Sequence, residues 1–350
     1  MTPHRSYVPG EHTGALVPPR RWPRAELETL TGELLDGDAV GGRRSSAIVN
    51  PDLGPAGGAS PGIDVSLNVH RPAERTEPHR HTSSVVSYVA AGRGHSVIGG
   101  RRIDWGPGDV FTTPAWMPHE HVADGDSEPV LRVAFSDAPL LRRLGILLHE
   151  GGDPSEAPEP PTAAPWDPEI GTPVAGADVR ILGYDDLLKP AWRPLGAQRW
   201  SSAAIHGALD PMDNGDPAYH GRRVILLYDP VTGASQGTVG RLLMFAGIIA
   251  AGEVHPPHRH TSVAVNYWTE GDGYSVVEGG RIEWEAGDLV ISPAWSAHGH
   301  ANDGGATAWG VVVHDTPLLY ELGVLLWQEA LDGTVARLGS DSVEQTAASS

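Results

Sequence analysis

The sequence predicts an all-β protein with two tandem antiparallel sandwiches or barrels, each followed by one short helix. Short apolar runs are interrupted by Gly, Pro and Asp at intervals of about ten residues, which is typical of antiparallel sandwiches and barrels. In addition, residues 79–121 align without gaps on residues 258–300, and 22 of these 43 positions are identical. The chain is therefore internally duplicated, and one sandwich or barrel is expected in each copy.

The similarity between the copies continues on both sides of the aligned segment. Each copy then covers about 130 residues, an ordinary size for a domain. The segment between them is rich in Pro, Gly and acidic residues, which is typical of a linker. The predicted regions are an N-terminal arm (1–19), a first barrel (20–150), a linker (151–178), a second barrel (179–330) and a flexible tail (331–350).

The elements of the first copy follow from its apolar runs and its turn residues. The expected strands are 84–90, 95–98, 102–105, 110–113 and 130–135. After the last strand, Asp137 is expected to cap a helix that Gly151 ends, and the second copy repeats this helix from Asp315. Asp109 and Asp288 lie in turns, where we expect their carboxylates to contact water.

Composition and charge exclude several classes of function. The chain has 44 Asp and Glu against 25 Lys and Arg, and no basic cluster that could neutralise a phosphate backbone, so nucleic acid is not an expected partner. The longest apolar run, 242–251, is about half of a membrane span, which predicts a buried strand and no membrane partner. No secretory signal is visible, and the expected location is cytoplasmic.

The 17 His and the absence of Cys leave imidazole and carboxylate as ligands for a transition metal. Residues i and i+2 of a strand share a face, so His79 and His81 should place two imidazoles together. His119 begins a strand 38 residues after His81, and in a small barrel it can return beside this pair. The same spacing recurs in the second copy. The predicted metal ligands are His79, His81, His119, His258, His260 and His298.

The pattern HRHTS, G-x-G and GD-x5-PAW-x2-H resembles the two motifs of the cupin superfamily. The duplicated layout over most of residues 20–330 resembles the bicupin family of gentisate, salicylate and 1-hydroxy-2-naphthoate ring-cleaving dioxygenases. The resemblance implies two jelly-roll (double-stranded β-helix) cupin barrels, each with one Fe(II), or with Mn, Ni or Zn in the isolated protein. It also implies a homo-oligomer, dimer or tetramer.

The same resemblance implies a non-haem Fe(II)-dependent dioxygenase whose partners are a hydroxylated aromatic carboxylic acid and O2. The ring would be cut between the carbons that carry the carboxyl and hydroxyl groups. His121 and His300, two residues beyond the third ligands, match a family His that acts on the substrate hydroxyl or on oxygen. A structural hydrogen bond is the alternative role for both.

Candidates for substrate binding lie upstream of the first motif and inside the second. The pairs Arg43–Arg44 and Arg222–Arg223 match the Arg-bearing strand of the family, and one member of each should face inward toward a carboxylate. Surface or interdomain salt bridges are the alternative for these arginines. The aromatic candidates for the pocket wall are Trp116 and Trp295, with a place in the core as the alternative.

The chain departs from the family at two positions in each copy. Ser83 and Ser262 stand where the family often has Gln, and Ser87 and Asn266 stand where it often has Arg. These departures favour a substrate other than gentisate. They keep two alternatives open: another metal-dependent bicupin oxygenase or isomerase acting on a specialised metabolite, or a non-catalytic bicupin binding protein. Whether one copy or both are catalytic also stays open.

Overall fold

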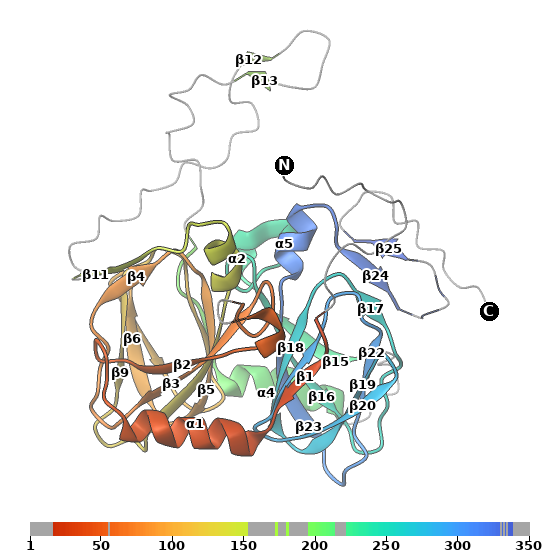
Figure 1. The fold of residues 1–350 in the computed structure, drawn as a ribbon, viewed down its shortest axis with the longest axis horizontal. Coiled ribbons are helices and arrows are strands. Elements are labelled where there is room, and N and C mark those ends of the chain that lie inside the picture. The colour runs from red at the N-terminus through yellow and green to blue at the C-terminus, as the bar shows by residue number, and fades with distance from the viewer. Residues whose placement is uncertain are drawn as a thin grey trace.

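The computed structural model describes residues 17–54, 57–152, 172–173, 180–181, 195–213, 222–329, 331, 333 and 335–338. Most of the predicted arm, linker and tail lies outside these residues. The described part forms two β-barrels, which confirms the predicted fold (Figure 1). No helix among the described residues is both long and apolar enough to cross a membrane.

The first barrel consists of a six-stranded sheet, β14-β8-β5-β10-β3-β2, and a five-stranded sheet, β11-β4-β9-β6-β7. All five strands expected in the first copy are present, with ends within one residue of the prediction. The strands are β2 (Arg44–Ile48), β3 (Asp64–His70), β4 (His79–His81), β5 (Val85–Ala91), β6 (Gly94–Ile98), β7 (Arg101–Trp105), β8 (Val110–Thr113), β9 (His119–Ala123), β10 (Val130–Ser136), β11 (His149–Gly151) and β14 (Arg199–Trp200).

The second barrel has a matching six-stranded sheet, β1-β21-β18-β23-β16-β15, and two three-stranded sheets, β20-β19-β22 and β17-β24-β25. A separate strand pair is formed by β12 (Thr172–Pro173) and β13 (Arg180–Ile181). The strands of the barrel are β1 (Arg20–Trp22), β15 (Arg223–Leu227), β16 (Leu243–Ile249), β17 (Arg259–His260), β18 (Ala264–Glu270), β19 (Asp272–Val277), β20 (Gly280–Glu285), β21 (Leu289–Ser292), β22 (His298–Ala301), β23 (Ala308–His314), β24 (Leu326–Gln328) and β25 (Ala336–Arg337).

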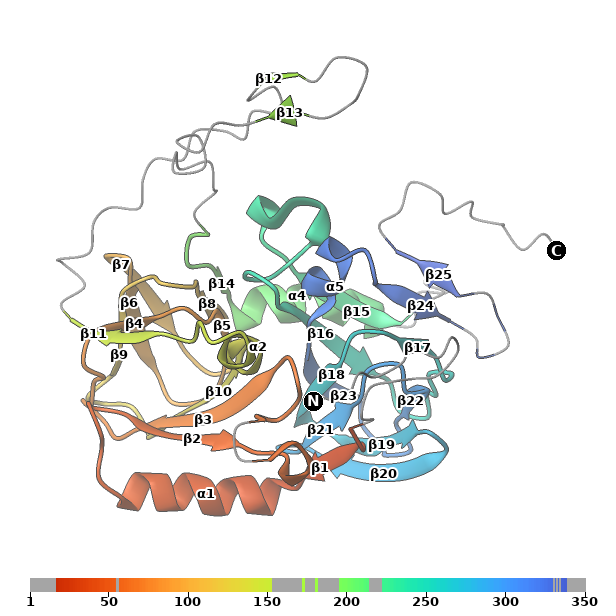
Figure 2. The ribbon, with the colours of Figure 1, turned by 45° about the horizontal axis from the view of Figure 1, so that its top comes forward.

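The two barrels exchange their first strands. Strand β1 precedes the first barrel but pairs with β21 of the second, and β14 precedes the second barrel but pairs with β8 of the first (Figure 2). The exchange buries Asp109 and Asp288, which are 4% and 0% exposed, so the expectation that they contact water is wrong. Each carboxylate instead accepts a hydrogen bond at 2.7 Å from the exchanged strand, from Arg199 and Arg21 respectively.

The large sheets are buried on both faces. Along β10, Arg132, Ala134 and Ser136 line the cavity of the first barrel. The alternate residues, Val133 and Phe135, lie in a hydrophobic core shared with strands of the second barrel. Because side chains of a strand alternate between its two faces, a single strand contributes both to the cavity and to the contact between barrels.

The described residues form four helices, α1 (Arg24–Asp36), α2 (Ala138–Arg143), α4 (Ser202–Asp213) and α5 (Thr316–Glu321), and two short 3-10 turns, η1 (Pro51–Leu53) and η3 (Pro230–Ser235). The two longer helices, α1 and α4, were not predicted from the sequence. In Figure 1, α1 runs beneath the first barrel, where it packs against β2 and β3. The prediction that Gly151 ends the helix after β10 is wrong, because Gly145 (φ 72°) follows α2 and residues 149–151 form β11.

Candidate metal centre

The predicted triads are clusters in the structure. In each barrel the three imidazoles offer one nitrogen apiece, and these nitrogens lie within 4.8 Å of one another. The period of two along β4 places His79 and His81 on one face, and the antiparallel register sets His119 opposite His79. In the second barrel, His298 lies opposite His258 in the same way.

Backbone carbonyls fix the orientation of all three rings in the first triad. Each Nδ1 lies 2.7–2.8 Å from a carbonyl oxygen, and the three carbonyls belong to Glu77, Ser83 and Met117. A carbonyl oxygen only accepts, so each Nδ1 carries the proton and each Nε2 keeps a free lone pair. The lone pairs are the metal-binding form of imidazole.

The second triad repeats this arrangement for two of its rings. His260 and His298 hydrogen-bond the carbonyl oxygens of Ser262 and Ser296 at 2.9 and 2.8 Å. The Nε2 of His260 is buried and has no hydrogen-bond partner among the described residues. A buried polar atom without a partner is unfavourable, whereas a cation at this point would satisfy it. The donor sets of both barrels therefore fit a divalent transition metal.

Burial keeps the triads neutral. Desolvation is the largest cause of a lowered pKa at every ligand, and it brings the pKa of His79 to about 3 and that of His81 to about 4. The pKa of His119 falls well below its ordinary value for the same reason, and burial also lowers the pKa of each ligand of the second triad. At neutral pH no proton has to be displaced from these nitrogens before a metal binds.

The two triads lie in cavities of different character. The cavity of the first barrel, about 190 Å³, is lined largely by hydroxyl, amide, imidazole and guanidinium groups. The cavity of the second barrel, about 280 Å³, is lined mainly by apolar side chains such as Phe245, Ile248 and Val311. Both volumes can hold a small aromatic acid, but hydroxyl side chains line only the first of the two cavities.

His121 and His300 line these cavities beside the triads. The Nδ1 of His121 lies 2.7 Å from the hydroxyl of Ser96, which also accepts a bond from Trp105 Nε1 at 2.9 Å. Because His121 is the only acceptor that the described residues offer this hydroxyl, its Nε2 carries the ring proton. His300 has the corresponding contact with Ser275 at 2.8 Å.

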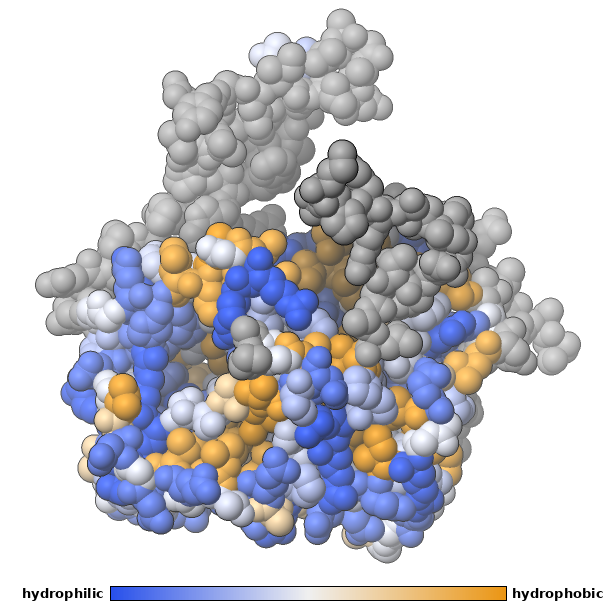
Figure 3. All heavy atoms as spheres, in the orientation of Figure 1, coloured by the Kyte–Doolittle hydropathy of each residue, from blue (hydrophilic) through white to orange (hydrophobic). Residues whose placement is uncertain are grey.

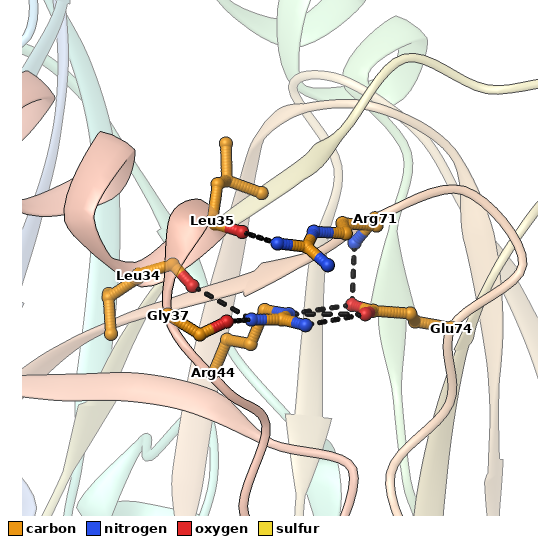
Figure 4. Close-up of polar contacts among 6 residues, drawn as sticks. All are labelled: Leu34, Leu35, Gly37, Arg44, Arg71 and Glu74. Atoms are coloured by element: carbon orange, nitrogen blue, oxygen red, sulfur yellow. Dashed lines mark hydrogen bonds and ion pairs between the residues drawn. The ribbon is translucent and has the colours of Figure 1, made fainter.

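The two arginines of the pair in the first barrel make different contacts. Arg44 forms an ion pair with Glu74 at 2.9 Å and also donates to the carbonyl oxygens of Leu34 and Gly37 (Figure 4). These bonds tie the end of α1 to the barrel and occupy the guanidinium. Arg43 also lines the cavity, and its Nη2 lies 2.7 Å from His149 Nε2.

The second barrel repeats this division. Arg223 pairs with Glu253 and donates to the carbonyl oxygen of Met212 at 2.6 Å, which ties α4 to β15. Arg222 lines the cavity and forms an ion pair with Glu329 at 2.8 Å. The first residue of each Arg–Arg pair is therefore the one whose guanidinium is not committed to holding a helix.

The two tryptophans that were expected in the pocket wall lie outside the triad cavities. Trp116 and Trp295 do not line the triad cavities. Their indoles instead stack beneath the guanidinium groups of Arg80 and Arg259, at 4.5 and 4.6 Å. Both residues adopt a positive φ, of 60° and 61°, in the turns that precede the third ligands. Their position does not support a contact with substrate.

Sequence reasoning missed a charged residue in the first cavity. Arg132 is 3% exposed, lines the cavity with the triad, and has an Nε without a hydrogen-bond partner among the described residues. Its signal is a single charge inside the apolar strand VLRVAF. His70, 2% exposed with an unpartnered Nε2, lines the same cavity and was also missed.

The chain is similar to known proteins along most of its length. The family model described as "Cupin domain" matches residues 69–134 and 247–314. A 5-nitrosalicylic acid 1,2-dioxygenase from a Bradyrhizobium species is 30% identical over 151 residues, which cover 42% of this chain and 71% of that protein. A 5-aminosalicylate 1,2-dioxygenase from a Comamonas species is 28% identical over 299 residues, covering 84% of this chain and 76% of that protein.

A solved structure supports the same architecture. The crystal structure of a salicylate 1,2-dioxygenase from Pseudaminobacter salicylatoxidans matches with a TM-score of 0.73. The match covers 91% of this chain and 90% of that one, at 22% sequence identity. At this identity the likeness concerns the fold alone, and it agrees with two tandem barrels in one chain.

Proposed function

Because the chain belongs to the bicupin gentisate 1,2-dioxygenase-like family of ring-cleaving dioxygenases, we propose that it uses Fe(II) and O2 to open a hydroxylated aromatic acid. The observation that carries this proposal is the convergence of three unprotonated imidazole nitrogens inside a barrel cavity. The substrate would be of the 2-hydroxybenzoate type, and the broken bond would join the carbons that carry the carboxyl and hydroxyl groups.

The residues of each triad would hold one metal ion. When bound, this metal would supply a divalent charge that attracts the anionic acid and polarises its oxygen atoms. In the first barrel, Arg43 lies at the cavity and its positive charge attracts the anionic acid. The Nε2–H of His121 can donate a hydrogen bond to an oxygen atom of the substrate or of O2.

The assembly and location of the protein belong to the same proposal. Exposed apolar side chains follow α2 and α5, including Leu144 (60% exposed) and Leu322 (62%), which supports a homo-oligomer, dimer or tetramer. Figure 3 shows orange, apolar atoms gathered over the region of α2. A cytoplasmic location suits an enzyme that depends on a reduced metal, because that compartment is kept reducing.

The decisive experiment is O2 uptake by the Fe(II)-loaded protein with salicylate, gentisate, 5-aminosalicylate and 1-hydroxy-2-naphthoate. The proposal expects consumption of O2 with at least one acid, a ring-opened product, and both atoms of labelled O2 in that product. The His79→Ala, His258→Ala double variant is the control that should lose the reaction. Metal-loaded protein that consumes no O2 with any of these acids would contradict the proposal.

A second candidate function shares the metal but not the substrate. Ser87 and Asn266 line the two cavities, at positions where the resemblance to the family leads us to expect Arg. These uncharged side chains favour an oxygenase or isomerase acting on a different metabolite. The acid screen separates the two candidates, because an enzyme for another metabolite would bind metal and leave all four acids unchanged.

A further inference from the structure

We propose that Arg132 is the residue that receives the substrate carboxylate, and that the ring is therefore cleaved in the first barrel. This inference rests on the proposed function, and it adds a specificity-determining residue to it. Arg132 lies in the triad cavity, has no counter-charge among the described residues, and corresponds to a glycine in the second barrel.

Arg132 lies inside the cavity that contains the first triad. It comes from β10, where Arg132, Ala134 and Ser136 point inward, and the register sets Ala134 opposite Ser87 on β5. Arg132 thus lies one inward-facing position along β10 from the residue that faces Ser87.

The Arg132 charge is buried without an anion. Its side chain is 3% exposed, and the described residues provide it with no ion pair or hydrogen bond. Its guanidinium carbon lies 5.8 Å from the ring centroids of Trp105 and Phe111. Burial lowers the pKa of Arg132 to about 9, so the group still carries its charge at neutral pH.

An unpaired buried charge is unfavourable for folding. Other arginines that line the cavities show the usual solution, since Arg44 pairs with Glu74 and Arg222 pairs with Glu329. A carboxylate that enters the first cavity would supply the missing charge, and the planar fork of a guanidinium can hold both of its oxygens. The unpartnered Nε2 of His70, in the same cavity, offers a further polar contact.

The second barrel cannot form the same contact. Arg132 lies opposite Asn68 and Val89, and Gly310 lies opposite the equivalent residues Gly247 and Trp268. Gly310 is therefore the structural counterpart of Arg132. A Cβ on Gly310 would lie 3.0 Å from the indole of Trp268, so that ring occupies the space that the arginine side chain needs.

The test measures the binding of salicylate and of salicylamide, its neutral analogue, to the full chain by calorimetry at pH 7.5. The variants are Arg132→Met, which preserves most of the volume, and Arg132→Lys, which preserves the charge without the fork. Arg102→Met is the matched control, because it removes one positive charge from an exposed position of the same barrel (59% exposed).

We expect Arg132→Met to weaken salicylate binding by about 10- to 100-fold and to leave salicylamide binding nearly unchanged. Arg132→Lys should show an intermediate loss, and Arg102→Met no loss. The thermal midpoint of Arg132→Met should equal or exceed that of the parent protein, because an uncompensated buried charge is removed. An equal loss for both ligands, or unchanged salicylate binding, would overturn the proposal.

Turnover by single-triad variants tests the choice of barrel. His79→Ala should abolish ring opening, and His258→Ala should retain it. Retention in His79→Ala would refute the assignment to the first barrel while leaving the proposed function intact. Conversely, charge-selective binding by Arg132 in a protein that consumes no O2 with any acid would refute the proposed function and leave the carboxylate site standing.

Discussion

Asp109 of the first barrel accepts a hydrogen bond at 2.7 Å from Arg199, a residue of the strand that precedes the second barrel. The same carboxylate accepts backbone hydrogen bonds from Ser202 at 2.7 Å and from Gly106 at 3.0 Å. A single buried side chain thus connects its own turn, the exchanged strand β14 and the beginning of α4.

Removal of the Asp109 carboxylate should lower the free energy of unfolding, because this side chain connects the two barrels. Asp109→Ala leaves two backbone N–H groups and a guanidinium without their acceptor, so we expect a loss of about 3 kcal/mol in the free energy of unfolding. Urea denaturation followed by tryptophan fluorescence measures it. Asp104→Ala removes an exposed ion pair with Arg102 and should cost less than about 1 kcal/mol. Equal effects of the two variants would contradict this role.

The acidic residues before α2 and α5 should make stability depend on pH. Burial raises the pKa of Asp137 and of Asp315 to about 6, although each accepts a backbone hydrogen bond, from Ser84 and Val263. Between about pH 4 and pH 6 the native state then binds more protons than the unfolded chain, so this contribution to stability falls as pH rises.

The corresponding variant is Asp137→Asn, which keeps the acceptor oxygen and removes the charge. We expect the variant to gain stability over the parent as pH rises: the difference in the free energy of unfolding, variant minus parent, should be larger at pH 7.5 than at pH 4.5 by on the order of 2 kcal/mol. Thermal unfolding at both values measures the difference. Asp126→Asn, at a position 85% exposed, is the control. A difference of the opposite sign would show that the native state prefers the charged carboxylate.

Helix α1 offers a stabilising substitution. Gly32 lies inside the helix, and a Cβ at this residue would have no atom within 4 Å. Because Ala loses less backbone entropy than Gly in a helix, Gly32→Ala should raise the free energy of unfolding by about 1 kcal/mol. Chemical denaturation at pH 7.5 tests this expectation, and a loss of stability would show that the helix backbone is not relaxed at this point.

Metal stoichiometry tests the independence of the two triads. The loaded parent protein should retain two equivalents of iron after desalting, and His79→Ala and His258→Ala should each retain one, because each removes a ligand from one site only. Elemental analysis of the desalted protein gives the values. Retention of a single equivalent by the parent would mean that one triad does not hold metal under these conditions.

The strands and the His triads could be predicted from local sequence patterns, because the local geometry of a strand determines them. The strands followed from apolar runs between turns, and the triads followed from the i, i+2 spacing together with the repeat of 38 residues between His81 and His119. Both features need only the alternation of a strand and the short return of a barrel. The same reasoning could have identified Arg132, since a lone charge in an apolar strand needs water, a counter-charge or a ligand beside it.

Features that depend on distant partners could not be read in this way. The burial of Asp109 is caused by Arg199, 90 residues further along the chain, and no local signal in its turn indicates this contact. Strand β1 is only three residues long, and its partner β21 lies in the other copy. The helix end at Gly145 was overlooked because Leu144 and Leu148 suggested a continuous apolar stripe, whereas both are more than half exposed.

The exchange of first strands has a consequence for synthesis of the chain on the ribosome. Arg21 emerges early, yet its acceptor Asp288 is made 267 residues later. Strand β1 therefore stays unpaired until β21 has been made, and the nascent first half has an uncovered sheet edge at β8 because β14 has not yet been made. Cutting the gene between the copies would leave each product with a foreign strand and an uncovered edge, so the halves should be recovered together or as aggregates.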